Sequence, residues 1–362
     1  MVTRDEVVWA YRLFLGREPE SETAIELHRQ LPDVEALRHT FLDSTEFAGA
    51  NKVNWLVRWL HGYWVAAPVI GGRYLMWIDL GDRFVSSACL QDDYEKEGTR
   101  FMNAALRPGD VVADVGADLG WFTLVASAIV GNEGRVHAFE PRAETANYLE
   151  KTVALNSLAD RVRVHRCALS DRQGEGVLTW SAATDNPGGS FLADATPAPD
   201  MERQPIPLRT LDDLALPRLD FLKVDVEGAE MRVFRGAQET LARCRPMILS
   251  ELHPQMLERV SGDAADAYFS FFDRLGYRAF IADRERWGEQ INAYPSDWPW
   301  PLINLALLPR PISLDQVVTP PGATSATEQD GGPAAHPSEK LHRDKKLFGR
   351  IIDTLRSAIG AG

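Results

Sequence analysis

The residues best placed to do chemistry are glycines set among carboxylates, in the segment Asp114-Val115-Gly116-Ala117-Asp118-Leu119-Gly120. An apolar run precedes this segment and a helical pattern follows it, so we expect a turn from a strand into a helix. Glycines at such a turn let the backbone approach a ligand closely, beyond the carboxyl end of the strand. The segment predicts a ligand-binding loop containing Gly116, Ala117 and Gly120; an ordinary tight turn is the alternative.

The charges around these glycines indicate the kind of ligand. The dinucleotide fingerprint, Gly-x-Gly-x-x-Gly, is absent. Instead, Asp114 opens the motif and Asp118 lies within it. Carboxylates repel a pyrophosphate and attract a sulfonium and an α-amino group. The loop therefore favours S-adenosylmethionine over NAD.

A single acid and a Ser-Asp pair follow the second and third expected strands. Glu140 ends an apolar run about 20 residues past the glycines, where an acid typically accepts both ribose hydroxyls. A solvated acid at a strand end is the alternative. Ser170 and Asp171 follow the third run, and we expect them beside the adenine.

A third group of polar residues follows the fourth and fifth runs. Asp225 and Glu227 come just after the fourth, and Glu251 and His253 end the fifth. Methyl transfer to a hydroxyl needs alignment and removal of the hydroxyl proton. Adjacent parallel strands end at one edge of a sheet, so we expect all four residues around the transferred methyl group.

Two mechanisms fit these four residues. In the first, His253 or Asp225 is the general base, with Glu227 beside it, since a neutral imidazole suits physiological pH. In the second, Asp225, Glu227, Glu251 and His253 bind Mg²⁺ or another divalent cation, which lowers the pKa of the hydroxyl. We favour the metal-free mechanism because magnesium sites usually keep several waters. For His253, a place at the start of a helix before Pro254 is the structural alternative.

The pattern around these residues predicts an α/β fold. Short apolar runs alternate with helical segments, which indicates a doubly wound, mostly parallel sheet with helices on both faces. The expected parallel strands are 111–115, 135–139, 162–166, 221–224 and 247–251, and the expected closing strands are 278–281 and 303–308.

The remaining segments are expected to form separate regions. Residues 1–60 show helical spacing, first in the recurrence of Val7, Val8, Tyr11 and Leu15, and then in helices at about 21–31 and 34–41. Residues 61–107 have alternating runs over 63–89, which predict hairpins, and then a helix over 95–106. The main domain covers 108–316. A Pro- and Gly-rich stretch, 317–339, predicts a disordered linker. Residues 340–362 predict a basic amphipathic helix, which suits a membrane surface, a protein partner or packing on the core.

The motifs taken together resemble the FkbM family of methyltransferases. The resemblance rests on the glycine loop, Phe139-Glu140-Pro141, Ala168-Leu169-Ser170-Asp171, Lys223–Glu230 and Glu251-Leu252-His253-Pro254. It implies a Rossmann-like fold, S-adenosylmethionine and O-methylation of sugars or polyketides. Tyr94-Glu95 and the loop of Asn186 with Gly188-Gly189-Ser190 also fit, and we expect Tyr94, Asn186 and Glu251 to bind substrate. Asp118 stands where the family usually has Asn.

The first fifty residues resemble a different family, the helical repeat called DUF4214. The resemblance rests on Tyr11–Pro19 and on Ser44-Thr45-Glu46-Phe47. It implies a carbohydrate setting and no catalytic residue.

Composition excludes several classes of function. The net charge of −13 argues against nucleic acid as a partner. Asp225-Val226-Glu227-Gly228 also differs from the Pro-Pro motif of enzymes that methylate nucleic-acid amines. No apolar run is long enough for a membrane span. We expect the three cysteines to be reduced and the protein to be cytoplasmic. Peripheral binding of the protein to the inner face of the membrane is the alternative location.

The sequence thus predicts an S-adenosylmethionine-dependent O-methyltransferase. Its expected acceptor is a hydroxyl of a sugar or glycan, including lipid-linked or cell-envelope glycans, or of a related metabolite. A NAD-dependent oxidoreductase and a non-catalytic scaffold of a glycan pathway are the alternatives.

Overall fold

The structure is a computed structural model of the 362-residue chain. It describes residues 2–15, 17–42, 44, 62–82, 84–181, 189–193, 201–312, 314 and 317. The expected linker, except Val317, and the expected terminal helix therefore lie outside the described residues, as does Asn186.

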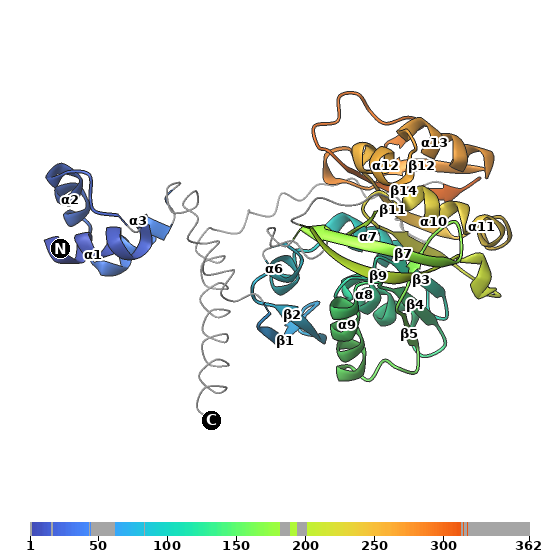
Figure 1. Ribbon diagram of the computed structural model, residues 1–362, viewed down its shortest axis with the longest axis horizontal. Helices are drawn as coiled ribbons and strands as arrows, with labels where there is room; N and C mark the ends of the chain where they lie inside the picture. The colour runs from blue at the N-terminus through green and yellow to red at the C-terminus, as the bar shows by residue number, and fades with distance from the viewer. Residues whose placement is uncertain are drawn as a thin grey trace, which may run out of the picture. The chain divides into compact units, whose positions relative to one another are not determined.

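An eight-stranded sheet is the centre of the main domain (Figure 1). Its five parallel strands lie in the order β5-β4-β3-β10-β11, and antiparallel β14, β12 and β13 complete one side. Their bounds are β3 Val111–Val115, β4 Arg135–Phe139, β5 Val162–His165, β10 Phe221–Val224, β11 Met247–Leu252, β12 Tyr277–Ile281, β13 Gln290–Ile291 and β14 Ile303–Pro309. This confirms the predicted mostly parallel α/β sheet, including both closing strands.

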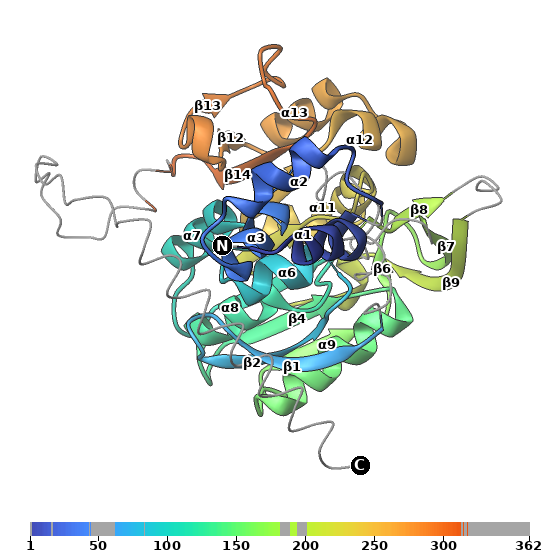
Figure 2. The same cartoon turned by 90° about the vertical axis from the view of Figure 1, so that its left-hand side faces the viewer.

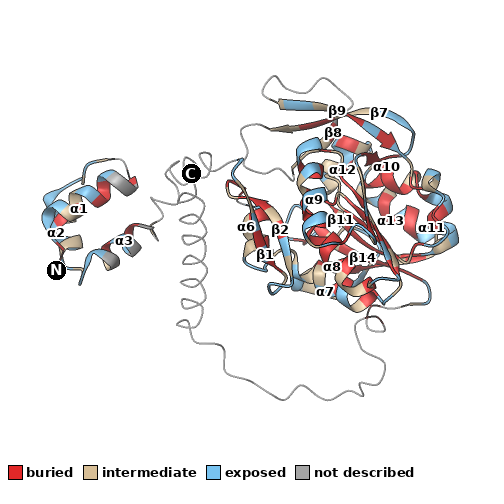
Figure 3. Ribbon diagram, turned by 90° about the horizontal axis from the view of Figure 1, so that it is seen from below, coloured by how far each residue is buried: buried red, intermediate tan, exposed pale blue. Residues whose placement is uncertain are grey.

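Helices cover both faces of this sheet, and the buried strands lie between them (Figure 3). One face packs against α7 (Lys96–Ala105), α8 (Trp121–Val130) and α9 (Ala143–Leu155). The other packs against α10 (Glu230–Arg235), α11 (Gln238–Cys244), α12 (Pro254–Ser261) and α13 (Ala265–Arg274). The strand order reverses between β3 and β10, which opens a crevice at the carboxyl ends of these strands.

A second, four-stranded sheet lies in the order β6-β9-β7-β8 and was not predicted. Its strands are β6 (Ala168–Leu169), β7 (Gly174–Ser181), β8 (Phe191–Ala193) and β9 (Met201–Arg209). It has a small core of its own, in which Leu178, Leu192 and Ile206 are buried. Since β6 continues the chain after β5, this sheet places side chains beside the crevice.

The lead-in region begins with the predicted hairpin, β1 (Trp64–Val69) and β2 (Tyr74–Asp79), beside α9 (Figure 2). The alternating pattern suggested strand as far as Cys89, and this is wrong: Val85–Leu90 forms helix α6. Asp82 explains the change, because its carboxylate accepts hydrogen bonds from the backbone N of Phe84 (2.9 Å) and Ser86 (2.7 Å). These bonds satisfy amides at the start of the helix.

The three N-terminal helical segments match the predicted ones. They are α1 (Arg4–Ala10) continued by η1 (Tyr11–Leu15), α2 (Glu22–Arg29) and α3 (Val34–Leu42). Val7, Tyr11, Ile25, Leu37 and Phe41 form their shared core. Among the described residues, no helix is both long enough and apolar enough to cross a membrane.

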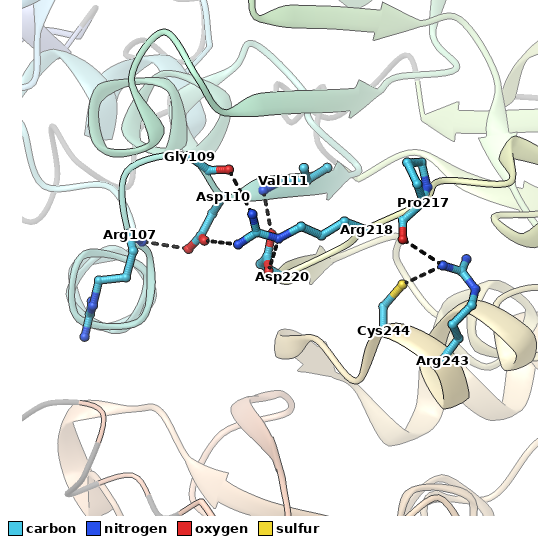
Figure 4. A network of polar contacts seen from close by, with 9 residues as sticks. All are labelled: Arg107, Gly109, Asp110, Val111, Pro217, Arg218, Asp220, Arg243 and Cys244. Carbon is cyan, nitrogen blue, oxygen red and sulfur yellow. Dashed lines mark hydrogen bonds and ion pairs between the residues drawn. The ribbon is translucent and has the colours of Figure 1, made fainter.

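Ion pairs connect the amino-terminal ends of two strands of the main sheet, at the edge opposite the crevice (Figure 4). Arg218 donates to Asp110 at 3.0 Å and to Asp220 at 2.8 Å. Asp220 also accepts a hydrogen bond from the N of Val111 at 2.8 Å. This network ties the start of β3 to the start of β10, so the two strands flanking the crevice share a fixed register.

Candidate active site

A cavity of about 450 Å³ lies where the strand order reverses between β3 and β10, at the carboxyl ends of β3, β4, β10 and β11. Of the predicted site residues, those that line it are Gly116, Ala117, Asp118, Gly120, Glu140, Tyr94, Asp225, Glu227 and Glu251. Residues from five separate segments therefore meet around one space.

The glycine loop forms one wall through its backbone conformation. Gly116 has φ +76°, and a Cβ there would lie 1.8 Å from the carbonyl oxygen of Asp225. Gly120 has φ +103° and begins α8. The N atoms of Gly116 and Ala117 donate to the Phe139 carbonyl at 3.1 and 3.0 Å. Only glycine allows β3 and β10 to approach this closely at Gly116.

Two acids face each other beyond β3 and β4. Oε2 of Glu140 accepts a hydrogen bond from the N of Asp118 at 3.0 Å, and Oε1 accepts one from the N of Arg142 at 2.8 Å. Burial, with Asp118 nearby, raises the pKa of Glu140 to about 8, and burial, with Asp82 nearby, raises that of Asp118 to about 7. Both carboxyls would lose their protons more readily beside a cationic ligand.

A buried lysine organises the middle of the site. Nζ of Lys223 donates to the Gly116 carbonyl at 2.7 Å and lies 3.2 Å from Asp225 and 3.8 Å from Asp114. Burial alone would lower the pKa of Lys223, but the neighbouring carboxylates raise it overall. Asp114 is fully buried, accepts a bond from Thr123 at 2.6 Å and does not line the cavity. It therefore acts on the site through Lys223.

Three more acids line the cavity from α7, β10 and β11. Burial, with Asp225 nearby, raises the pKa of Glu95 to about 7 and that of Glu227 to about 8. It also raises the pKa of Glu251 well above its ordinary value. Glu95, Asp118 and Glu227 have φ values of +39°, +46° and +54°. Strained backbone at non-glycine residues is typical of functional sites.

The second sheet supplies an apolar wall on the side of β4. Cys167, Ala168 and Leu169 line the cavity together with Leu178 and Leu192. Ser170 and Asp171, predicted beside the adenine, do not line it: Ser170 is fully buried and donates to Asp171 at 3.2 Å. The residues that line the cavity here thus lie one to three positions before Ser170 in the chain.

His253 lies at the start of α12 and does not line the cavity. Its Nδ1 accepts a hydrogen bond from the N of Met256 at 3.4 Å, so it caps the helix. In the described part of the chain, no group of three or more His, Cys, Asp or Glu side chains is arranged to hold a metal ion. Asp225, Glu227, Glu251 and His253 are therefore not brought together as metal ligands.

Several residues that line the cavity were not predicted to do so. Lys223 and Glu95 appeared in the motifs but were given no role. Phe84, Trp121 and Phe122 add aromatic rings to the side of α6 and α7, and Phe84 is 56% exposed. Strands β10 and β3 pair with Lys223 opposite Asp114. A single lysine and a single aspartate in two otherwise apolar strands could have predicted this buried ion pair.

Comparisons with known proteins agree with this geometry. A model described as the methyltransferase FkbM domain matches residues 111–279. The AMB antimetabolite synthetase AmbE of Pseudomonas aeruginosa is 28% identical in an alignment 257 positions long, which covers 60% of this chain and 12% of that protein. The 31-O-demethyl-FK506 methyltransferase FkbM of Streptomyces tacrolimicus is 30% identical in an alignment 178 positions long, which covers 41% of this chain and 67% of that protein.

A crystal structure of methyltransferase FkbM from Methylobacillus flagellatus gives a TM-score of 0.36 at 16% identity, covering 57% of this chain and 50% of the other. The chain spans about an eighth of AmbE and two thirds of the Streptomyces protein. The matched domain begins at β3 and ends within β12, and so includes the glycine loop, Glu140 and the acids after β10 and β11. The chain belongs to the FkbM family of methyltransferases.

Proposed function

We propose that the protein transfers a methyl group from S-adenosylmethionine to a hydroxyl of a sugar or glycan, or of a related metabolite. The observation that carries the proposal is the make-up of the cavity between α6, α7 and the ends of β10 and β11. It combines the carboxylates of Glu95, Asp225, Glu227 and Glu251 with the rings of Phe84, Tyr94 and Trp121. Carboxylates accept hydrogen bonds from hydroxyls, and aromatic rings suit the apolar faces of a sugar.

The chain offers the groups that the cofactor needs. S-adenosylmethionine, when bound, supplies a methyl group on a positively charged sulfur. Oδ2 of Asp118 is buried and has no hydrogen-bond partner among the described residues, so it suits the amino group of the methionine part. Glu140, at the end of β4, suits the ribose hydroxyls, and Leu178 and Leu192 suit the adenine.

Asp225 and Glu227 are the proposed proton acceptors, because both line the cavity and His253 does not. The acceptor oxygen forms its new bond to the methyl carbon while the carbon–sulfur bond breaks, and the hydroxyl proton passes to one of these carboxylates. Lys223 holds Asp225 at 3.2 Å and so fixes its position. General-base assistance of this kind typically contributes about 10² or more to the rate.

The relatives support oxygen as the acceptor atom. The Streptomyces relative is named for methylating 31-O-demethyl-FK506. We extend this to a hydroxyl of a sugar because of the aromatic rings and acids described above. The proposal includes lipid-linked and cell-envelope glycans, as well as a cytoplasmic location for the protein.

The test is to incubate the protein with methyl-labelled S-adenosylmethionine and a panel of neutral sugars, amino sugars and cell-envelope glycan extracts. We expect label in an acid-stable ether on a sugar oxygen, located by mass spectrometry. Glycans from cells with and without the gene should differ by the same methyl group. Label only on nitrogen or carbon, or only on acceptors without sugar, would contradict the proposal.

A further inference from the structure

The turn between β10 and α10 carries both proposed proton acceptors, and a buried carboxylate holds its backbone. Oε1 of Glu230 accepts hydrogen bonds from the N of Val226 at 3.1 Å and from the N of Gly228 at 3.1 Å. Glu230 is the first residue of α10 and is only 2% exposed. One oxygen atom thus binds both amides that flank Glu227.

The conformation of this turn needs support. Glu227 has φ +54° and Gly228 has φ +94°, so two successive residues are in the left-handed region. A left-handed conformation at Glu227 is unfavourable on its own and persists only where neighbouring contacts impose it. Asp225 donates its N to the Val115 carbonyl at 3.1 Å, which fixes the start of the turn.

The end of the turn is packed against α12. A Cβ on Gly228 would lie 2.3 Å from the carbonyl oxygen of Met256, and Ser261 donates its hydroxyl to the Gly228 carbonyl at 2.6 Å. Between these two fixed ends, the middle of the turn is held by the two hydrogen bonds to Glu230 and by a backbone hydrogen bond from the N of Ala229 to the Val226 carbonyl at 3.3 Å. The backbone conformation of Glu227 therefore sets the direction of its side chain.

We propose that Glu230 is a positioning residue, which holds the turn of residues 225–228 so that Asp225 and Glu227 face the cavity. The inference rests on the proposed function for its catalytic meaning. Glu230 does not line the cavity, so it acts through the turn and not on the substrate.

The surroundings of Glu230 argue that its role is the turn and not an ion pair. Its Oε2 is buried and has no hydrogen-bond partner among the described residues. Burial raises the pKa of Glu230 to about 7. A side chain kept for its charge would need a partner for that charge, whereas one kept for two amide bonds needs only an acceptor oxygen.

The amide of glutamine keeps an acceptor oxygen at this position and loses the charge, which gives a sharp test. The variants are Glu230→Gln, Glu230→Ala and, as a matched control, Glu258→Gln on the exposed face of α12. Hydrogen–deuterium exchange of residues 225–229 reports on the turn, with residues 111–115 of β3 as the internal reference. Titration with S-adenosylmethionine and S-adenosylhomocysteine reports on whether the acids still face the charged sulfur.

In Glu230→Ala, we expect exchange over 225–229 to rise at least tenfold with β3 unchanged, and the affinity ratio between the two ligands to fall at least threefold. Glu230→Gln and Glu258→Gln should match the unmodified protein. The proposal is overturned if Gln behaves like Ala, if exchange rises equally in β3, or if Ala changes neither readout. Exchange is measured without ligand, so a failure of the turn is distinguishable from a failure to bind S-adenosylmethionine at all.

Discussion

Glu140 connects the glycine loop to the end of β4 through one carboxylate, which accepts hydrogen bonds from the backbone N of Asp118 and of Arg142. Glu140→Ala should weaken S-adenosylhomocysteine binding by about tenfold or more, because hydrogen bonds from the ribose to a charged acceptor are lost. Isothermal titration measures this. Glu133→Ala, exposed in the turn before β4, is the control and should bind normally. An unchanged dissociation constant for Glu140→Ala would remove that residue from the site.

Single substitutions also decide whether Glu227 or His253 is the general base. Glu227→Gln should lower kcat by about 10², the loss expected for a general base, with the affinity for the uncharged product S-adenosylhomocysteine unchanged. His253→Ala should leave kcat within about threefold, since His253 caps α12 outside the cavity. Single-turnover methyl transfer at pH 8 compares the two variants. A large loss in His253→Ala together with full activity in Glu227→Gln would reverse the assignment.

Residue types and spacing predicted the loop and Glu140 because each has a recognisable place after a strand. They left two roles open for His253, since an imidazole that caps a helix and one that takes a proton have the same sequence context. The strained residue Glu95 was also missed, because its left-handed conformation depends on tertiary packing around α7. Those roles become visible only when the segments are brought together.

At the scale of elements, the parallel strands were predictable because each is a short, mostly apolar segment that alternates with a helical pattern. The second sheet was not. Strand β9, Met-Glu-Arg-Gln-Pro-Ile-Pro-Leu-Arg, contains two prolines and several charges, and strand β6 is two residues long. Such strands exist because β7 pairs with β9 along its length, which no local pattern reveals. The apolar wall of the cavity was therefore missed with them.

The buried ion pairs between β3 and β10 can be tested by their contribution to the free energy of unfolding. Lys223→Met should lower the free energy of unfolding by about 3 kcal/mol, because it leaves Asp114 and Asp225 without their cation. Urea denaturation followed by circular dichroism measures the loss. The double variant Asp114→Asn, Lys223→Met should recover part of it, because one buried charge is removed. The single variant Asp114→Asn completes the cycle, and a loss in the double variant equal to the sum of the two single losses would show that Asp114 and Lys223 are not coupled.

For the whole molecule, the acids of the cavity predict how stability depends on pH without ligand. Burial raises the pKa of Glu140 and Glu227 from 4.5 to about 8, and that of Asp118 from 3.8 to about 7. The folded state therefore holds protons that the unfolded state has already lost. This contribution is complete below pH 4 and should be lost as pH rises from about 5 to about 8. Thermal unfolding across this range should show a falling Tm; a rising Tm would contradict the assignment.

The most direct test of the central claim is isothermal titration of the full chain with S-adenosylmethionine, S-adenosylhomocysteine and NAD, at pH 6 and at pH 8.5. A cavity lined by carboxylates should bind the first two at one site and show no binding of NAD. S-adenosylmethionine should gain more affinity than S-adenosylhomocysteine on going to the higher pH, because its charged sulfur meets ionised acids. Binding of NAD with no binding of S-adenosylmethionine at either pH would contradict the account.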